Sequence, residues 1–129
     1  MAKTALEMER HEWRGYHAGA AMRQRQAATD CRTQQRWESA QQVAREAARR
    51  LRDEFGARRI VLFGSAATGS SFTQWSDIDL AVWGLRPERF YDAVAAVTAL
   101  SAEIPIDLVD ALQCSEGFND VIEREGMDL

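Results

Sequence analysis

The fold is decided by two apolar runs, Ile60-Val-Leu-Phe-Gly-Ser65 and Asp77-Ile-Asp-Leu-Ala-Val-Trp83, which are joined by the eleven residues 66–76. The first run is short and apolar and ends at a glycine and a serine, which is typical of a buried strand. The second run alternates polar and apolar residues at its start, as a strand does. The connection is rich in small and polar residues and predicts a loop or one short helical turn.

Three carboxylates lie where strands usually carry apolar residues. Asp77 and Asp79 are two apart on a predicted strand, so both side chains point to one face, and Asp107 interrupts a third apolar run. Carboxylates on strands are unfavourable unless they are exposed, paired or metal-bound. Three hard oxygen ligands favour Mg²⁺, which also takes phosphate oxygens of a substrate. The alternative is that Asp77 caps a turn while Asp79 and Asp107 face solvent.

The turn after the first strand suits an approaching phosphate. Gly64 and Ser65 precede a segment of small residues, so backbone N–H groups and a hydroxyl can come close to phosphate oxygens. The chain has neither the Gly-Lys-Ser/Thr of a Walker loop nor a GxGxxG dinucleotide fingerprint. The Gly-Ser turn, the connection and Asp-x-Asp form a compound motif that is more specific than either part.

Helical patterns surround these strands. An apolar stripe runs at steps of three and four from Trp37 to Phe55 and should cover the sheet, and Gly56 stands where a C-cap glycine belongs. Further helices are expected from Pro87 to Leu100 and from Ser115 to Glu125. The order helix, strand, strand, helix, strand, helix predicts an α+β fold, in which helices pack on a small sheet.

Composition excludes several protein classes. The 129 residues are 46% hydrophobic and 28% charged, which is typical of a globular domain rather than a fibrous or disordered chain. No run approaches the roughly 18 to 20 apolar residues of a membrane span, and the N-terminus does not resemble a secretory signal. Cys31 and Cys114 form no CxxC motif, so both are expected to be reduced thiols in a cytosol.

The compound motif, Leu62-Phe-Gly-Ser65 through Ser76-Asp-Ile-Asp-Leu-Ala-Val82 with Asp107 following, resembles the minimal nucleotidyltransferase domains of the DNA polymerase β superfamily. The resemblance covers about residues 56–112. It implies a polymerase β-like nucleotidyltransferase fold with a small mixed sheet. We expect that domain over residues 34–129 and a helical extension over residues 1–33.

The resemblance also implies the roles of the site residues. Gly64 and Ser65 would position the nucleotide phosphates, and Asp77, Asp79 and Asp107 would form the site of two Mg²⁺ ions, with Asp107 activating the attacking hydroxyl. Many members carry arginines in the Gly-Ser turn, whereas this chain has Gly64-Ser-Ala-Ala-Thr-Gly69. The candidates to supply the missing guanidinium are Arg58, Arg59 and Arg86.

Similar short domains are encoded beside HEPN-type toxins, which are small helical RNases, and act as antitoxins by adenylylating a toxin tyrosine. We therefore expect a cytoplasmic protein adenylyltransferase that uses ATP and Mg²⁺ on a HEPN-type toxin encoded nearby. It would work in a homo- or hetero-oligomer, without a membrane or nucleic-acid partner. The alternatives are a non-catalytic binding antitoxin and a small-molecule, antibiotic-type nucleotidyltransferase.

The extension has an apolar patch of its own. Its large apolar residues suggest contact with a second subunit or a partner chain, or a second layer folded back on the domain. Two glycines, Gly15 and Gly19, are expected to weaken any long continuous helix here. The patch comprises Leu6, Met8, Trp13, Tyr16 and Met22.

Overall fold

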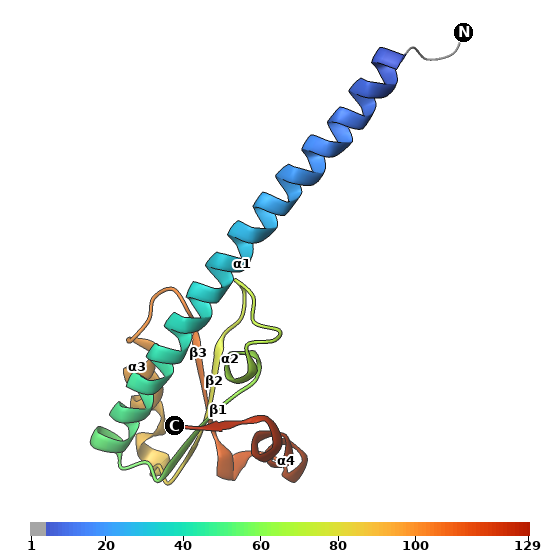
Figure 1. The fold of residues 1–129 in the computed structure, drawn as a ribbon. Helices are drawn as coiled ribbons and strands as arrows, with labels where there is room; N and C mark the ends of the chain where they lie inside the picture. Colours follow the sequence, from blue (N-terminus) through green and yellow to red (C-terminus); the bar gives the residue numbers. More distant parts are fainter. Residues whose placement is uncertain (1–4) are drawn as a thin grey trace. The chain divides into compact units, whose positions relative to one another are not determined.

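The computed structural model describes the backbone of residues 5–129 and the side chains of residues 30–129. The chain divides into two compact units, Met1–Gln34 and Gln35–Leu129. The apolar patch expected in the extension lies outside the residues whose side chains are described, and the division into 1–33 and 34–129 stays a prediction. The elements (Figure 1) are α1 (Ala5–Phe55), β1 (Arg59–Phe63), α2 (Ser65–Thr68), β2 (Ile78–Trp83), the 3₁₀ turn η1 (Pro87–Arg89), α3 (Phe90–Thr98), β3 (Ile106–Asp110), the 3₁₀ turn η2 (Ala111–Gln113), α4 (Glu116–Glu125) and β4 (Met127–Asp128).

Helix α1 is continuous through Gly15 and Gly19, the two glycines that are expected to weaken a long helix. Each costs only about 1 kcal/mol relative to alanine, and the surrounding Ala, Arg, Gln and Glu residues all favour helix. The helix ends at Phe55, and Gly56 follows with a φ of 70° as the predicted C-cap glycine. In the part of the chain that the structure describes, no helix is long and apolar enough to cross a membrane.

Four strands form one mixed sheet in the order β3-β2-β1-β4. Strand β1 pairs antiparallel with β2 and with β4, whereas β2 and β3 are parallel. The parallel pair needs a crossover connection, which η1 and α3 provide. The predicted α+β fold with a small mixed sheet is confirmed.

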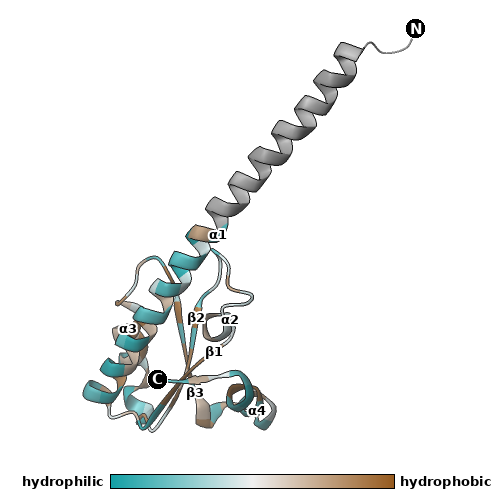
Figure 2. Ribbon diagram, viewed as in Figure 1, coloured by the Kyte–Doolittle hydropathy of each residue, from teal (hydrophilic) through white to brown (hydrophobic). Residues whose placement is uncertain are grey.

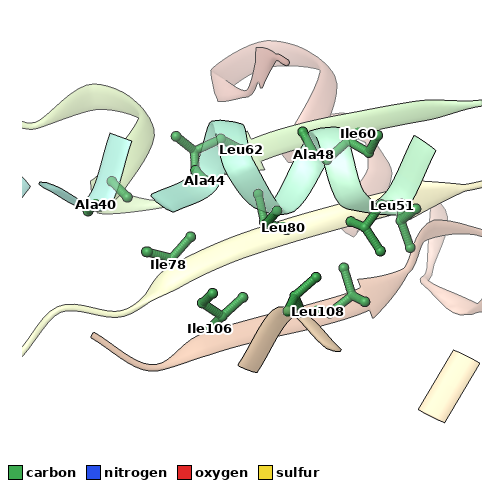
Figure 3. Close-up of a cluster of buried hydrophobic side chains, with 14 of the residues drawn as sticks. Ala40, Ala44, Ala48, Leu51, Ile60, Leu62, Ile78, Leu80, Ile106 and Leu108 are labelled. Atoms are coloured by element: carbon green, nitrogen blue, oxygen red, sulfur yellow. The ribbon is translucent and has the colours of Figure 1, made fainter. Parts of the chain in front are cut away.

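The apolar stripe of α1 covers one face of this sheet, as the sequence predicts. Figure 3 shows its small side chains lying over the strands, where alanines allow the helix to approach closely. Helix α3 contributes Ala93 and Val97 to the same cluster, while Trp37 and Phe55 are partly buried at its edge. The labelled residues of the cluster are Ala40, Ala44, Ala48, Leu51, Ile60, Leu62, Ile78, Leu80, Ile106 and Leu108.

The opposite face of the sheet is covered only in part. Val61, Ala81, Ala111 and Ile122 form a second, smaller buried cluster, to which α4 contributes Ile122. Successive strand residues alternate between the two clusters, because side chains along a strand point to opposite faces. In Figure 2 the strands are largely brown, because apolar side chains lie on both of their faces, while teal, hydrophilic segments lie on the helices.

The C-terminal segment contains a strand that the sequence pattern did not indicate. Helix α4 begins after Ser115, whose Oγ accepts a hydrogen bond from the Phe118 N–H at 3.2 Å, and it ends before Gly126, as expected. Residues Met127–Asp128 then form β4 against β1. Two residues are too few to show a period, so only the partner strand reveals this element.

Candidate active site

The register of the sheet brings two of the three aspartates side by side. Asp79, the second residue of β2, is paired with Phe63 at the end of β1 and with Asp107 near the start of β3. Asp77 directly precedes β2. Because neighbouring strands lie about 4.8 Å apart, Asp79 and Asp107 meet at one end of the sheet, with Asp77 next to them in the chain.

These carboxylates lie on the face of the sheet that α1 and α3 leave open. Ile78 and Ile106, the strand neighbours of Asp79 and Asp107, are buried beneath α1. Since side chains alternate along a strand, the aspartates point to the opposite face. Asp77 and Asp107 are exposed and Asp79 is half-buried, so a ligand can reach all three from solvent.

The Gly-Ser turn approaches Asp79 so closely that a side chain at its first residue would displace the carboxylate. A Cβ atom on Gly64 would lie 2.7 Å from Oδ2 of Asp79, and the φ of Gly64 is 72°. This backbone conformation favours glycine. Ser65 begins the four-residue helix α2, which ends at Gly69. The structure therefore places Gly64 and Ser65 beside the central aspartate.

The site concentrates negative charge, and no cationic side chain of residues 30–129 forms an ion pair with its aspartates. Burial, and then the charges of Asp107 and Asp77, raise the pKa of Asp79 from 3.8 to about 6. Arg50 and Arg59 form ion pairs with carboxylates outside the site. Such a group is stabilised by an external cation, whose charge reverses the effect on the pKa.

The donor atoms fit Mg²⁺, which prefers carboxylate oxygens. In the described residues, no three His, Cys, Asp or Glu side chains already form a common ligand set. Mg²⁺ rarely needs one, because one or two carboxylates usually hold it together with waters and substrate phosphates. Asp79 and an adjacent aspartate therefore fit a metal ion that is also held by waters or by phosphate oxygens of a substrate.

The three arginines considered as replacements for the missing turn arginine lie at the other end of β1 and β2. Arg59 is paired with Trp83, four residues from the Phe63–Asp79 pair and thus about 13 Å away along the strand. The Arg58 N–H donates to the Trp83 carbonyl, and Arg86 caps η1 beyond β2. None of them is at the aspartate end.

Helix α1 makes three polar contacts near the site that sequence reasoning missed. Arg36 donates to the carbonyl of Ser76, the residue before Asp77, and both Trp37 and Gln41 donate to the carbonyl of Ala66 in α2. The stripe pattern indicated Trp37 only as a packing residue. Backbone carbonyl acceptors leave no mark on a sequence, so the pattern could not reveal these hydrogen bonds.

The solved structures that resemble this chain include toxin–antitoxin complexes. A chain of a toxin–antitoxin with AMP-PNP is 25% identical, with a TM-score of 0.55, over 66% of this chain and 70% of that one. A chain of a mutant MntA–HpeT toxin–antitoxin is 28% identical, with a TM-score of 0.55, over 66% and 69%. A chain of the complex between tri-AMPylated Shewanella oneidensis HEPN toxin and MNT antitoxin shares the fold at 24% identity, with a TM-score of 0.52, over 69% and 70%.

The family follows from the sequence match. No curated protein matches the chain. Residues 46–129 match the model of the family described as polymerase beta, nucleotidyltransferase. The matched range contains the Gly64–Ser65 turn, the sheet and all three aspartates, so this chain belongs to the polymerase beta nucleotidyltransferase family.

Proposed function

We propose that this protein is an antitoxin that transfers AMP from ATP to a tyrosine hydroxyl of a partner HEPN-type toxin, with Mg²⁺ as cofactor. The observation that carries the proposal is the pairing of Asp79 with Asp107 beside Gly64, on the open face of the sheet, where no cationic side chain of residues 30–129 forms an ion pair with them. The catalytic domain would comprise residues 34–129 and act in the cytoplasm in complex with its partner.

Each site residue has a distinct task in this reaction. Asp77 and Asp79, with Asp107, would hold the metal, and bound Mg²⁺ supplies positive charge that offsets the charge developing on the phosphates. Asp107 accepts the proton of the attacking tyrosine hydroxyl. The phenolic oxygen then bonds to the α-phosphorus, and the bond to pyrophosphate breaks. Gly64 leaves room for the triphosphate next to Asp79, and Ser65 offers a hydroxyl and a backbone N–H.

The partner and the nucleotide are supported by the similar structures. Two of them, at 25% and 28% identity, come from toxin–antitoxin complexes, and one of these contains AMP-PNP, an analogue of ATP.

The test is transfer of labelled AMP to the partner toxin. The protein, the HEPN-type protein encoded beside it, Mg²⁺ and α-labelled ATP should give label on a toxin tyrosine, located by mass spectrometry. The variant Asp77→Asn should transfer no label. Asp92→Asn is the matched control, because Asp92 is exposed on α3, away from the site.

The outcomes separate the alternatives. Neutralisation of the toxin that survives both Asp77→Asn and Asp79→Asn, without label on any protein, would indicate a binding antitoxin. Label on a small hydroxyl compound but not on the toxin would indicate a small-molecule nucleotidyltransferase. Either result contradicts the proposal.

A further inference from the structure

Residues 36–41 of helix α1 contact three separate segments near the site. The side chains of Arg36, Trp37 and Gln41 reach backbone carbonyls near the strand ends that carry the aspartates. All three belong to the unit Gln35–Leu129. Apolar packing of α1 on the sheet does not require three side-chain donors within six residues, so these hydrogen bonds need a separate explanation.

Two of these side chains fix the Gly-Ser turn. The indole N–H of Trp37 donates to the Ala66 carbonyl at 2.8 Å, and the side-chain amide of Gln41 donates to the same oxygen. The Trp37 ring also lies against Gly69, where an added Cβ would be 2.9 Å from the ring. Helix α2 is thus held at its middle by two donors and at its end by an aromatic ring.

The third side chain joins the two segments that lead into the aspartate-bearing strands. The guanidinium of Arg36 donates to the carbonyl of Ser76 at 3.1 Å, and makes a longer contact of 3.5 Å with the carbonyl of Glu103. The first carbonyl precedes Asp77, and the second lies four residues before Asp107. The Ile78 N–H donates to the Pro105 carbonyl at 2.9 Å and links the same two segments.

Arg36 does not act by pairing with the site charges. The charges that shift the pKa of Asp79 are those of Asp107 and Asp77, and both raise it. The Nε atom of Arg36 is buried and has no hydrogen-bond partner among the described residues, although a buried donor normally finds one. A partly buried guanidinium that donates to one carbonyl and lies near a second constrains their separation.

We propose that residues 36–41 of α1 form an alignment clamp with two independent arms. Trp37 and Gln41 hold the phosphate-binding turn, and Arg36 holds the segments that lead into β2 and β3, which keeps Asp79 and Asp107 side by side next to Asp77. The clamp acts from the face opposite to the carboxylates, so its members are positioning residues that do not touch substrate. This inference rests on the nucleotidyltransfer proposed above.

The two arms predict different kinetic defects. Trp37→Phe keeps an aromatic side chain but removes the N–H donor and the indole atoms nearest Gly69, so the KM for ATP should rise about fivefold to tenfold while kcat changes less than about twofold. Arg36→Lys keeps the positive charge but loses the planar fork, so kcat should fall about tenfold with little change in KM. A residue that only stabilised the fold would not change KM and kcat separately.

Matched variants provide the controls. Gln42→Ala and Arg45→Lys alter exposed residues of the same helix, and Trp83→Phe alters a tryptophan at the far end of β2. All three should leave KM and kcat within about twofold of the original protein, and thermal unfolding should show that every variant is folded at the assay temperature. Adding Gln41→Ala to Trp37→Phe should raise KM further without lowering kcat.

Calorimetric binding of AMP-PNP with Mg²⁺ separates this inference from the proposed function. If the unaltered protein binds the analogue but labels no toxin, the proposed function fails, and a Kd weakened about fivefold or more by Trp37→Phe but not by Arg36→Lys would still support the clamp. The clamp is overturned if both variants change KM and kcat alike, or if neither changes them. It is equally overturned if the activity lost matches the fraction unfolded.

Discussion

Among residues 30–129, charged side chains are paired at one end of the β1–β2 pair and unpaired at the other. At the end where Arg59 faces Trp83, the guanidinium binds Glu123 at 2.5 Å and Asp128 at 2.8 Å and lies 4.6 Å from the centre of the Trp83 ring. At the end where Phe63 faces Asp79, no cationic side chain of residues 30–129 forms an ion pair with the three aspartates, and the pKa of Asp79 is raised.

The difference indicates that the charged groups at one end stabilise the fold, whereas those at the other end serve to bind a ligand. Paired charges at the Arg59 end connect β1 to α4 and β4 and need nothing from outside. The carboxylates at the aspartate end repel one another, which is unfavourable for the fold. Removing a charge there should therefore lower activity and raise stability, whereas removing Arg59 should lower stability and leave activity unchanged.

The largest effect is expected from Asp79→Asn. AMP transfer should fall by at least about a hundredfold, because loss of one charge-stabilising group in an active site costs of this order. The same variant should unfold at a higher temperature than the original protein at pH 7.5, since it removes a half-buried charge. Transfer assays and thermal unfolding measure the two effects. If AMP transfer persisted in Asp79→Asn, the aspartate end would not be the functional end of the β1–β2 pair.

A smaller loss of AMP transfer activity is expected from Gly64→Ala. The new methyl group would lie 2.7 Å from Asp79 Oδ2, at a backbone φ of 72° that alanine rarely adopts, so the turn and the carboxylate must move apart. We expect about a tenfold loss in kcat/KM for ATP. Gly117→Ala is the control, because Gly117 in α4 has free space around it and alanine favours helix. Equal activities of the two variants would show that the close approach has no role.

The stability of the nucleotide-free protein should depend on pH through Asp79. Its folded pKa of about 6 exceeds the unfolded value of 3.8, so ionisation destabilises the fold. The cost is absent below about pH 3.8, grows as the pH rises toward 6 and is complete above it. It should be on the order of 1 kcal/mol after allowance for the exposed half of the group.

Chemical denaturation at pH 4, 5, 6 and 7.5 measures this dependence. The stability advantage of Asp79→Asn over the original protein should shrink as the pH falls. Added Mg²⁺ should stabilise the original protein more at pH 7.5 than at pH 5, because the metal competes with the proton, and it should have less effect on the variant. An advantage that is constant across this range would mean that Asp79 does not titrate there.

The smallest effect is expected at the opposite end, from Arg59→Ala. Its ion pairs are largely exposed, so their loss together with the Trp83 contact should lower the melting temperature by only a few degrees. Higher salt should reduce the difference, because exposed charges are screened. AMP transfer should be unchanged. A transfer defect in this variant would show that the two ends are coupled.

Much of the fold could be predicted because apolar periodicity reports burial. The stripe on α1, the strands at 60–63 and 78–83, and the helix after Ser115 follow directly from spacing and capping residues. Strand β4 was missed because two residues carry no period.

The site was only partly accessible to the same reasoning. The spacing of Asp77 and Asp79 places both on one face, but it does not say which strand adjoins them. The pairing of Asp79 with Asp107 depends on the parallel crossover through α3. The contacts of Arg36 and Trp37 end on carbonyl oxygens, which every residue has, so residue types could not identify them.

The indole of Trp37 has a practical consequence, because it is a fluorophore built into the wall of the Gly-Ser turn. Its N–H is bonded to Ala66 and its ring lies against Gly69, so a shift of that turn changes the polarity around the ring. In a variant whose other tryptophans, Trp13, Trp75 and Trp83, are replaced by phenylalanine, the emission of Trp37 should therefore respond when a nucleotide moves the turn. Such a variant reports binding without an introduced label.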